Sequence, residues 1–365
     1  MTIFFKDKRI LVTGACGTVG SELIHQLLTD TRYAPKEVIG LDNNENSLFF
    51  LDQAYLRYTN ARFFVGDVRH LDELMRKFCD VDIVFHAAAL KHVILSERSP
   101  EQAVETNILG IQNIITAANS NNVEKVIFTS SDKAVNPTNV MGTSKLMGER
   151  LMTAANSNKR GKGPIFTSTR FGNILGSSGS VVSIFQNQIL TGGPITLTDK
   201  AMTRFIMSTK EAVKLVIDSA LIAQGGEVFI TKMPVIQIKD LAHAMIELLS
   251  IDGKIDKKKI EINEIGMKPG EKLYEELMSL EEVRRTVELN DYFSVLPAFR
   301  GIYNDIKYDY DNVKSSKVNK AYISQKENPI SIQEIKKIII ENNILEKPDQ
   351  TITKRYWPGD KEQQS

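Results

Sequence analysis

The chain has 365 residues, a formal net charge of +1, 42% hydrophobic residues and 25% charged residues. This length and composition predict one large or two modest globular domains and exclude a disordered chain. A net charge this close to zero gives no global electrostatic field. We therefore expect neither nucleic acid nor a membrane surface as a partner.

The sequence offers no sign of a disulfide framework, a metal centre or a membrane span. Cys16 and Cys79 are the only cysteines, and we expect both to be free thiols in a reducing cytoplasm. The five histidines show no metal-binding spacing, so we predict no metal. No signal-peptide core and no apolar run of about 18 to 20 residues is present, so we expect a cytoplasmic protein without a membrane partner.

Short apolar, β-branched runs alternate with helical patterns through the first half of the chain. The helical patterns cover 19–28, 71–78 and 103–118. The apolar runs predict strands at 9–13, 37–41, 62–65, 82–86, 125–130, 165–170 and 227–230. Strands that alternate with helices are typical of βαβ units. The pattern predicts an α/β fold with a Rossmann-type, doubly wound parallel sheet of these seven strands.

The second half of the chain departs from this alternation. A Gly-Gly-Pro turn at 192–194 precedes a short strand at 195–197, and a helix at 238–249 leads into a basic stretch at 253–259. The chain is loop-rich from there to about residue 308. We expect a smaller substrate-binding lobe from 191–204 and 233–310, and a first domain from 1–190 to which 205–232 returns.

The C-terminal part carries one further helix signal. Ser331 and Glu334 form a capping-box pattern ahead of an apolar helix at 332–344. We therefore predict a helical C-terminal extension at 311–346. The tail at 347–365 is polar, and we expect it to be disordered or bound to a partner.

Three glycines follow the first predicted strand and open the first predicted helix. Gly14, Gly17 and Gly20 form a GxxGxxG pattern. Glycines allow the backbone to turn sharply and to approach a pyrophosphate, and the helix start at Thr18 offers free N–H groups and a positive dipole end. The alternative is that the glycines serve tight turns only. The position between strand and helix favours a dinucleotide site.

An acidic residue at the end of the second predicted strand selects the dinucleotide. Asp42 follows Gly20 by 22 positions, where a carboxylate accepts hydrogen bonds from the adenosine ribose. It would repel a 2′-phosphate, and residues 42–44 contain no arginine, so we expect NAD rather than NADP. The remaining cofactor contacts are expected after the third and fourth strands, with Asp67 on the adenine amino group, and Val68, Ala87 and Ala88 beside it.

Several longer segments resemble a known family. The GxxGxxG spacing is similar to that of extended short-chain dehydrogenases/reductases. HAAALKHV at 86–93, SSDKAVNPTNVMGTSK at 130–145, TRFGNILGSSGSV at 169–181 and KPGEKLYEEL at 268–277 are more specific. Together they resemble UDP-N-acetylglucosamine 4,6-dehydratases of the CapD-like polysaccharide biosynthesis group, in its soluble short form. The resemblance runs from about Lys8 to Leu277.

The resemblance implies a reaction without net redox change. C4 of the sugar is oxidised with tightly held NAD, water is eliminated across C5 and C6, and the hydride returns to C6. UDP-N-acetylglucosamine would become a UDP-2-acetamido-2,6-dideoxy-4-hexulose for surface polysaccharide or glycoprotein synthesis. Family members form dimers or hexamers, so we expect a homo-oligomer. The configuration at C5 stays open.

Ser131, Asp132 and Lys133 come at the end of the fifth predicted strand, where ligands bind in open α/β sheets. The resemblance implies that Asp132 is the acid toward O6 and Lys133 the base at C5. Asp132 must then be protonated and Lys133 neutral, and we expect desolvation to shift both pKa values. The strand must end here for both side chains to act together. The alternative is an ordinary strand-end turn.

One position departs from the general dehydrogenase pattern. The family's Tyr-x-x-x-Lys appears here as Met141 and Lys145. Methionine cannot accept a proton, so either the chain is a silent NAD-binding regulatory module or Ser131, Asp132 or Lys133 takes the O4 proton. Some dehydratases of the resembled group carry methionine here, which favours the second reading. Lys145 is expected on the nicotinamide ribose.

The resemblance also implies substrate contacts. Lys91 is expected near the sugar, Asn173 on the diphosphate and Arg204 on the diphosphate or ribose. The strand that carries Thr196 and Thr198 is expected to read the uracil, and Glu271 to bind the uridine ribose. A second enzyme reading is a UDP-hexose 4-epimerase, which has little use for an acid–base pair at Asp132 and Lys133.

Overall fold

The computed structural model describes residues 4–177, 179–251, 259–267, 270–299 and 306–345. The predicted basic stretch at 253–259, apart from its last residue, lies outside the described residues. The predicted polar tail at 347–365 lies outside them as well.

A ten-stranded sheet forms the centre of the molecule, in the order β16-β14-β15-β10-β6-β5-β4-β1-β2-β3. The strands from β3 to β10 pair in parallel with their neighbours. Their bounds are β1 Arg9–Thr13, β2 Glu37–Asp42, β3 Ala61–Val65, β4 Ile83–His86, β5 Lys125–Ser131, β6 Ile165–Phe171 and β10 Val228–Thr231. This confirms the predicted α/β fold with a doubly wound parallel sheet, and each predicted strand lies within one residue of an observed one.

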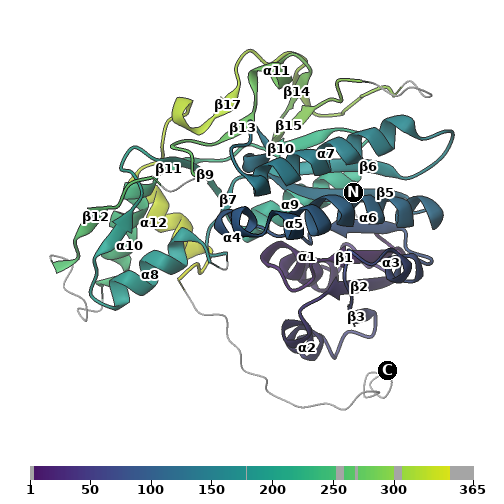
Figure 1. The fold of residues 1–365 in the computed structure, drawn as a ribbon, viewed down its shortest axis with the longest axis horizontal. Helices are drawn as coiled ribbons and strands as arrows, with labels where there is room; N and C mark the ends of the chain where they lie inside the picture. The colour runs from purple at the N-terminus through teal and green to yellow at the C-terminus, as the bar shows by residue number, and fades with distance from the viewer. Residues whose placement is uncertain (1–3, 178, 252–258, 268–269, 300–305, 346–365) are drawn as a thin grey trace.

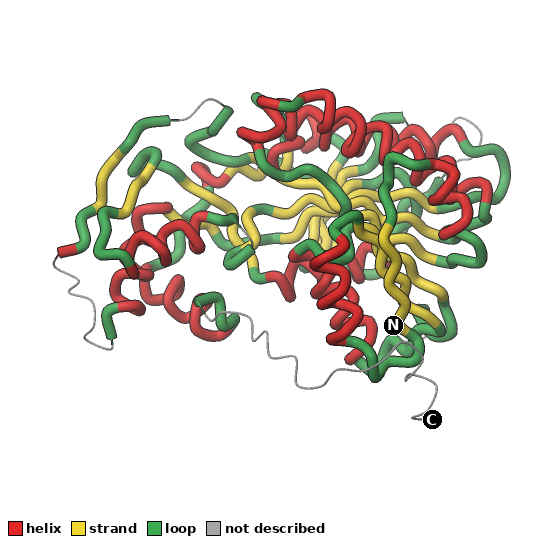
Figure 2. Tube along the Cα trace, turned by 60° about the horizontal axis from the view of Figure 1, so that its bottom comes forward, coloured by secondary structure: helices red, strands yellow, loops and turns green. Residues whose placement is uncertain are grey.

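Helices cover both faces of this sheet (Figure 2). On β1, Ile10 and Val12 belong to one apolar cluster, whereas Leu11 belongs to the other. The first cluster includes residues of α1 (Thr18–Thr29) and α9 (Thr209–Ile222); the second includes residues of α3 (Leu71–Lys77), α6 (Gly110–Ser120) and α7 (Val140–Asn158). Because both faces are buried, the strands are apolar at consecutive positions.

Shorter helices connect these elements. The patterned segment 103–118 is not one α-helix but α5 (Pro100–Ala103), a π-helical turn η1 (Val104–Leu109) and α6. Two further helices, α2 (Glu45–Ala54) and α4 (Val93–Arg98), follow β2 and β4.

The predicted set of seven strands does not complete the sheet. β15 (Tyr292–Val295) pairs antiparallel with β10, and β14 (Thr286–Leu289) and β16 (Val313–Ser315) extend the sheet further. These strands fall in the segments that the sequence assigned to the small lobe and the C-terminal extension. Without them the apolar strand β10 would be an open edge, with unpaired backbone groups.

A third apolar cluster builds a small lobe beside the sheet. It joins residues of α8 (Val181–Leu190), α10 (Ile238–Leu249), α12 (Ile332–Glu341) and β8 (Ile195–Leu197). Figure 1 shows these helices gathered at one end of the molecule. β8 pairs in parallel with β12 (Ile262–Glu264). The capping box of Ser331 and Glu334 at the start of α12 is confirmed.

A three-stranded sheet lies between the two parts, in the order β11-β9-β7. Its strands are β7 (Asn173–Ile174), β9 (Thr203–Met207) and β11 (Val235–Gln237). Gly172 joins β6 to β7, and a Cβ atom there would lie 2.7 Å from the Cβ of Phe205. The glycine therefore allows β7 to lie close to β9.

One more pair of strands closes this region. β13 (Glu276–Met278) pairs antiparallel with β17 (Tyr322–Ile323), and α11 (Leu280–Val283) and the 3-10 turn η4 (Ser324–Lys326) follow them in the chain. In the ranges that the structure describes, no helix combines the length and apolar character needed to cross a bilayer.

Candidate active site

The glycine loop forms a tight cradle between β1 and α1. Gly14 has a φ of 71°, and a Cβ atom there would lie 2.6 Å from the backbone N of Ala88. A Cβ atom on Gly20 would lie 2.1 Å from the carbonyl oxygen of Gly14. Ala87 donates its N–H to the carbonyl of Thr13. The loop, the start of α1 and the segment after β4 are thus in close contact, which only glycine permits.

The start of α1 is open to an anion. Gly17 is its N-cap, no side chain caps it, and its first turn, which begins at Thr18, contains no acidic residue. Free N–H groups and the positive end of the helix dipole favour a pyrophosphate at this point. At the end of β2, Asp42 accepts hydrogen bonds from the N–H of Cys16 and the N–H of Asn44, both at 2.9 Å. These bonds hold its carboxylate beside the loop.

Asp67 and Val68 follow β3, the strand next to β2 in the sheet. The Asp67 carboxylate accepts a hydrogen bond from Nη2 of Arg69 at 2.6 Å, and this bond lowers its pKa. Val68 is buried, and a Cβ atom on Gly110 would lie 2.9 Å from it. The structure thus directs the Asp67 carboxylate to Arg69, while Val68 packs against the start of α6.

Behind the cradle, buried titratable groups have few charged partners. His86 at the end of β4 is fully buried, and its Nδ1 lies 2.7 Å from Oγ1 of Thr13. Lys145 on α7 donates to the carbonyl of Thr129 at 2.9 Å. Burial lowers the pKa of His86 to about 3 and that of Lys145 to about 8. Met141 lies one helical turn before Lys145 and is 3% exposed.

The acid–base pair lies where β5 ends. The strand stops at Ser131, and Asp132 and Lys133 lie in the 3-10 turn η2 (Asp132–Ala134). Because the strand has ended, the two side chains meet: Nζ of Lys133 donates to Oδ1 of Asp132 at 3.1 Å. The hydroxyl of Ser131 donates to the same oxygen at 2.6 Å. Asp132 is buried, whereas the Lys133 side chain is 30% exposed.

A second acidic residue, absent from the sequence-based site, completes this cluster. Oε1 of Glu275 lies 3.2 Å from Nζ of Lys133 and 3.3 Å from Nε of Arg204. Its Oε2 accepts a hydrogen bond from Nδ2 of Asn173 at 2.8 Å. The structure therefore brings Asn173 and Arg204 to the pair formed by Asp132 and Lys133, with Glu275 as the shared partner.

The charges of this cluster differ from the expectation based on desolvation alone. Burial opposes ionisation of Asp132, but the Lys133 ammonium and the hydrogen bonds outweigh it and lower the pKa of Asp132 to about 2. Burial also opposes the Lys133 ammonium, but the charges of Asp132 and Glu275 hold its pKa above the usual range. Burial and the charge of Asp132 raise the pKa of Glu275 to about 7. The free structure thus keeps Asp132 and Lys133 ionised, because each has the other as a partner.

The remaining predicted substrate residues lie on other segments. Lys91 follows β4, and burial lowers its pKa. On β8, Oγ1 and N–H of Thr196 both bond the side-chain amide of Gln188, at 2.8 and 3.1 Å. Thr198 follows this strand directly, and Glu271 precedes Glu275 by four positions. The structure places the threonines in the small lobe and not in the charged cluster.

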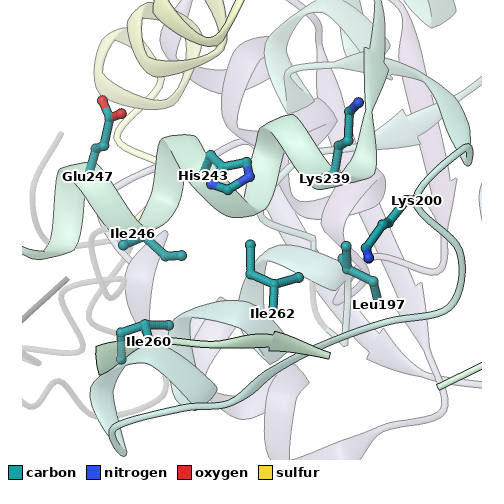
Figure 3. Close-up of a pocket in the computed structure, with 8 residues that line it drawn as sticks. All are labelled: Leu197, Lys200, Lys239, His243, Ile246, Glu247, Ile260 and Ile262. Atoms are coloured by element: carbon teal, nitrogen blue, oxygen red, sulfur yellow. The ribbon is translucent and has the colours of Figure 1, made fainter. Parts of the chain in front are cut away.

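A pocket of about 440 Å³ lies in the small lobe, between α10 and the pair β8–β12. Figure 3 shows Ile246 on the side of α10 that faces Ile260 and Ile262, with Glu247 directed away from them. Leu197, the residue between Thr196 and Thr198, also lines this pocket. None of the acid–base residues lines it, so the pocket is separate from the charged cluster.

A family model described as "Polysaccharide biosynthesis protein" matches residues 10–297. The chain belongs to this family.

Three relatives of this chain carry different names. An "uncharacterized membrane protein" of Methanocaldococcus jannaschii is 47% identical over 94% of this chain and 98% of its own. A UDP-N-acetylglucosamine 4,6-dehydratase (inverting) of Campylobacter jejuni is 37% identical over 93% of this chain and 98% of its own. A UDP-glucose 4-epimerase of Rickettsia bellii is 36% identical over 92% of this chain and 96% of its own. The two named enzymes both modify UDP-sugars, by different reactions.

Solved structures share the fold. The X-ray structure of Pen from Bacillus thuringiensis matches with a TM-score of 0.86 and 40% identity, over 94% of this chain and 100% of that one. A dTDP-glucose 4,6-dehydratase from Streptomyces venezuelae, solved with NAD bound, matches with a TM-score of 0.64 and 24% identity, over 73% of this chain and 86% of that one. The second likeness shows the short-chain dehydrogenase/reductase fold.

Glu275 is the residue that the sequence-based site missed. The segment 268–277 contains three glutamates, at 271, 275 and 276. Glu276 accepts hydrogen bonds from Asn136, whereas Glu275 contacts Lys133. No local signal separates these neighbours, because burial of Glu275 depends on η2, β7 and β9, which are distant in the sequence.

Proposed function

We propose that this member of the nucleotide-sugar-modifying short-chain dehydrogenases/reductases is an NAD-dependent UDP-N-acetylglucosamine 4,6-dehydratase. Its product would be a UDP-2-acetamido-2,6-dideoxy-4-hexulose for surface polysaccharide or glycoprotein synthesis. One observation carries the proposal: Asp132 and Lys133 lie in contact at 3.1 Å at the carboxyl end of β5. A carboxyl group and an amine at one point suit removal of a proton and protonation of a leaving hydroxyl at adjacent carbons.

The residues around the glycine loop fit NAD. Gly14, Gly17 and Gly20 allow the loop to pack closely on itself and on the segment after β4, and the start of α1 offers its N–H groups to a pyrophosphate. The Asp42 carboxylate suits the adenosine ribose and disfavours NADP. Lys145 lies on α7 behind the cradle and would reach the nicotinamide ribose. Bound NAD would supply the acceptor for the C4 hydride and its return to C6.

The chain itself would move the protons of the elimination. Lys133 takes the proton from C5, and Asp132 gives a proton to O6 as the hydroxyl leaves. Ser131 holds Asp132 through a hydrogen bond at 2.6 Å. Met141 has no acid–base group, so we assign the proton of O4 to the cluster at 131–133.

Substrate binding would join the cluster to the small lobe. We assign the sugar to Lys91, the diphosphate to Asn173 and Arg204, and the uridine to the segment of Thr196 and Thr198 together with Glu271, as predicted from the sequence. Asn173 and Arg204 support this assignment because they lie against Glu275 beside Lys133. The lobe boundaries at 191–204 and 233–310 remain proposals. Within them, the strands β14 and β15 belong to the central sheet.

A UDP-hexose 4-epimerase is the second candidate. A relative of 36% identity carries that activity in its name. Epimerisation needs oxidation at C4 and rotation of the ketone, but no elimination. Product analysis separates the candidates: we expect purified chain and NAD to convert UDP-N-acetylglucosamine to a product lighter by one water, and Lys133→Ala to abolish this conversion.

Other outcomes would overturn the proposal. A mass-neutral conversion to UDP-N-acetylgalactosamine would establish an epimerase. Bound NAD with no conversion of the UDP-sugar would favour the silent regulatory module. An NMR spectrum of the dehydrated product would further show whether C5 is retained or inverted.

A further inference from the structure

Three side chains, two of them cationic, converge on the buried carboxyl group of Glu275. Its Oε1 lies 3.2 Å from Nζ of Lys133 and 3.3 Å from Nε of Arg204. Its Oε2 accepts a hydrogen bond from Nδ2 of Asn173 at 2.8 Å. Glu275 is 5% exposed. Because all three partners are donors, these contacts stabilise the carboxylate form of Glu275.

Backbone contacts hold this carboxylate and the guanidinium of Arg204 in place. Nη1 of Arg204 donates to the carbonyl of Thr203 at 2.8 Å, and Nη2 donates to the carbonyl of Lys272 at 2.9 Å. The hydroxyl oxygen of Ser324 accepts the backbone N–H of Glu275 at 2.9 Å. The two charged groups are therefore in contact before any substrate binds.

The charges that meet in this cluster balance only when Glu275 is counted. Lys133 and Arg204 contribute two positive charges, and Asp132 contributes one negative charge. Without the carboxylate of Glu275, the cluster would carry a surplus positive charge at Arg204. Such a charge in a largely buried site attracts an anionic ligand, because little water screens it. Glu275 cancels this surplus and occupies the donors that a ligand carboxylate would use.

Under the function proposed above, this charge balance acts at C6 of the sugar. Asp132 is the acid toward O6, and Asp132 and Glu275 contact the same ammonium group of Lys133, at 3.1 and 3.2 Å. A C6 substituent within hydrogen-bond reach of Asp132 therefore lies close to Glu275 as well. A neutral hydroxyl is accepted there at little cost, whereas a carboxylate would face two buried negative charges.

We propose that Glu275 is a specificity-determining residue, which makes the site accept sugars with a neutral C6 hydroxyl and reject uronic acids, whose C6 is a carboxylate. The proposal rests on the dehydratase function proposed above, because that function places C6 beside Asp132. A bound uronate has no C6 hydroxyl to lose as water, so it would only block the site. Rejection of uronates therefore keeps the site open to its substrate.

Asp132 by itself does not provide this selectivity. Its negative charge is matched by Lys133 at 3.1 Å, which leaves the charge of Arg204 to pair with the carboxylate of a uronate. Glu275 takes that partner away. Its charge is thus the one that decides between the two classes of sugar.

The first test compares two ligands that differ only at C6, UDP-N-acetylglucosamine and the corresponding UDP-N-acetylglucosaminuronate. Each is titrated calorimetrically into protein saturated with NADH, which cannot accept a hydride from C4, so neither ligand turns over. Burial and the charge of Asp132 raise the pKa of Glu275 to about 7. The titration is therefore made at about pH 8, where the carboxylate predominates. The wild type should bind the uronate about tenfold more weakly or worse. Equal Kd values would overturn the proposal, whether or not any variant folds.

The second test changes the charge of Glu275. Glu275→Gln removes the charge at nearly constant shape, and it should reduce the ratio of the two Kd values by about tenfold, through tighter binding of the uronate. Glu275→Asp keeps the charge and should keep the wild-type ratio. A merely structural role would weaken both ligands alike and leave the ratio of Glu275→Gln unchanged, which would refute the proposal. A fall of the ratio in Glu275→Asp as large as in Glu275→Gln would also refute it.

Glu276→Gln is the matched control. It makes the same change in net charge on the neighbouring residue, which bonds Asn136, so it should keep the wild-type ratio. A ratio that falls equally in both Gln variants would assign the effect to net charge and not to Glu275.

Failure of the proposed function gives a different result. If the ratio depends on Glu275 but no product lighter by one water forms with NAD, the dehydratase function is refuted and the selectivity at the cluster stands. Dehydration by a wild type that binds both ligands equally refutes the role of Glu275 alone.

Discussion

Two buried regions lie at the carboxyl ends of neighbouring central strands, β4 and β5, and they differ in how their titratable groups ionise. Behind the glycine loop, burial lowers the pKa of His86 to about 3 and that of Lys145 to about 8, so His86 is neutral at pH 7 and Lys145 loses its proton more readily than an ordinary lysine. In the cluster after β5, Asp132 and Lys133 stay ionised although Asp132 is 2% exposed. Burial alone therefore does not determine the protonation state; the partners do.

The contacts of the two lysines explain the difference. Lys145 donates to a backbone carbonyl at 2.9 Å and lies over the ring of Phe128. Lys133 has a carboxyl oxygen at 3.1 Å and another at 3.2 Å. A carbonyl dipole offsets less of the desolvation of an ammonium than a full negative charge does.

A third site follows the rule of the charged cluster. Arg170 on β6 is 1% exposed and bonds the carboxylates of Glu149 and Glu282. Glu149 belongs to α7 and Glu282 to α11, which follows β13. This ion-pair network ties the segment that carries Glu275 to the central sheet, and it shows that paired charges are retained in the interior.

The largest expected effect is on the charged cluster. Lys133→Ala and Asp132→Asn should each lower kcat for dehydration by about 10²- to 10⁴-fold, because each removes one proton-transfer group. Product formation followed by mass spectrometry measures this. Met141→Ala serves as the matched control, because methionine moves no proton, and it should lose far less activity than Lys133→Ala. Near-wild-type rates in both cluster variants would refute the assignment.

A smaller effect is expected on stability, from the buried His86. The pKa of His86 is lower in the folded chain, about 3, than the ordinary value of 6.5. Its contribution to stability is therefore present above pH 6.5 and is lost as the pH falls toward 3. Between pH 7 and pH 5, this contribution to the free energy of unfolding should fall by about 2 kcal/mol. Urea unfolding of the wild type and of His86→Asn measures it as the difference between them.

The control for this measurement is the exposed His92. His92→Asn should keep the pH dependence of the wild type, whereas His86→Asn should show a shallower decline. Parallel curves for His86→Asn and the wild type would show that His86 is not the neutral buried group described here.

The smallest effect tests the shape of the cradle. Gly20→Ala would place a Cβ atom 2.1 Å from the carbonyl oxygen of Gly14, so the loop must move. We expect the Kd for NAD to increase by about tenfold, or about 1.4 kcal/mol. Calorimetric titration with NAD measures it. Gly163→Ala has no neighbour closer than 3.7 Å and should bind NAD as the wild type does; an equal Kd in both variants would contradict a cofactor role for the loop.

The sequence predicted the central fold well because its signals are local. Apolar runs mark β1 to β6 and β10, and the spacing of three glycines marks the cradle within a single turn. The strands β14 and β15 were missed because their apolar residues alternate with polar ones such as Glu288 and Ser294. Only the pairing of β15 with β10, and of β14 with β15, identifies them as part of the sheet.

The amino-acid sequence by itself determined the parallel sheet, the glycine loop and the adjacency of Asp132 and Lys133, since these depend on short-range sterics and on hydrophobic periodicity. Tertiary structure alone decided which of two neighbouring glutamates joins them. It also decided the charges of the cluster, because a pKa depends on desolvation and on partners brought in from distant segments. Glu275 and Lys133 meet across 142 positions of the chain, a contact that no local pattern encodes.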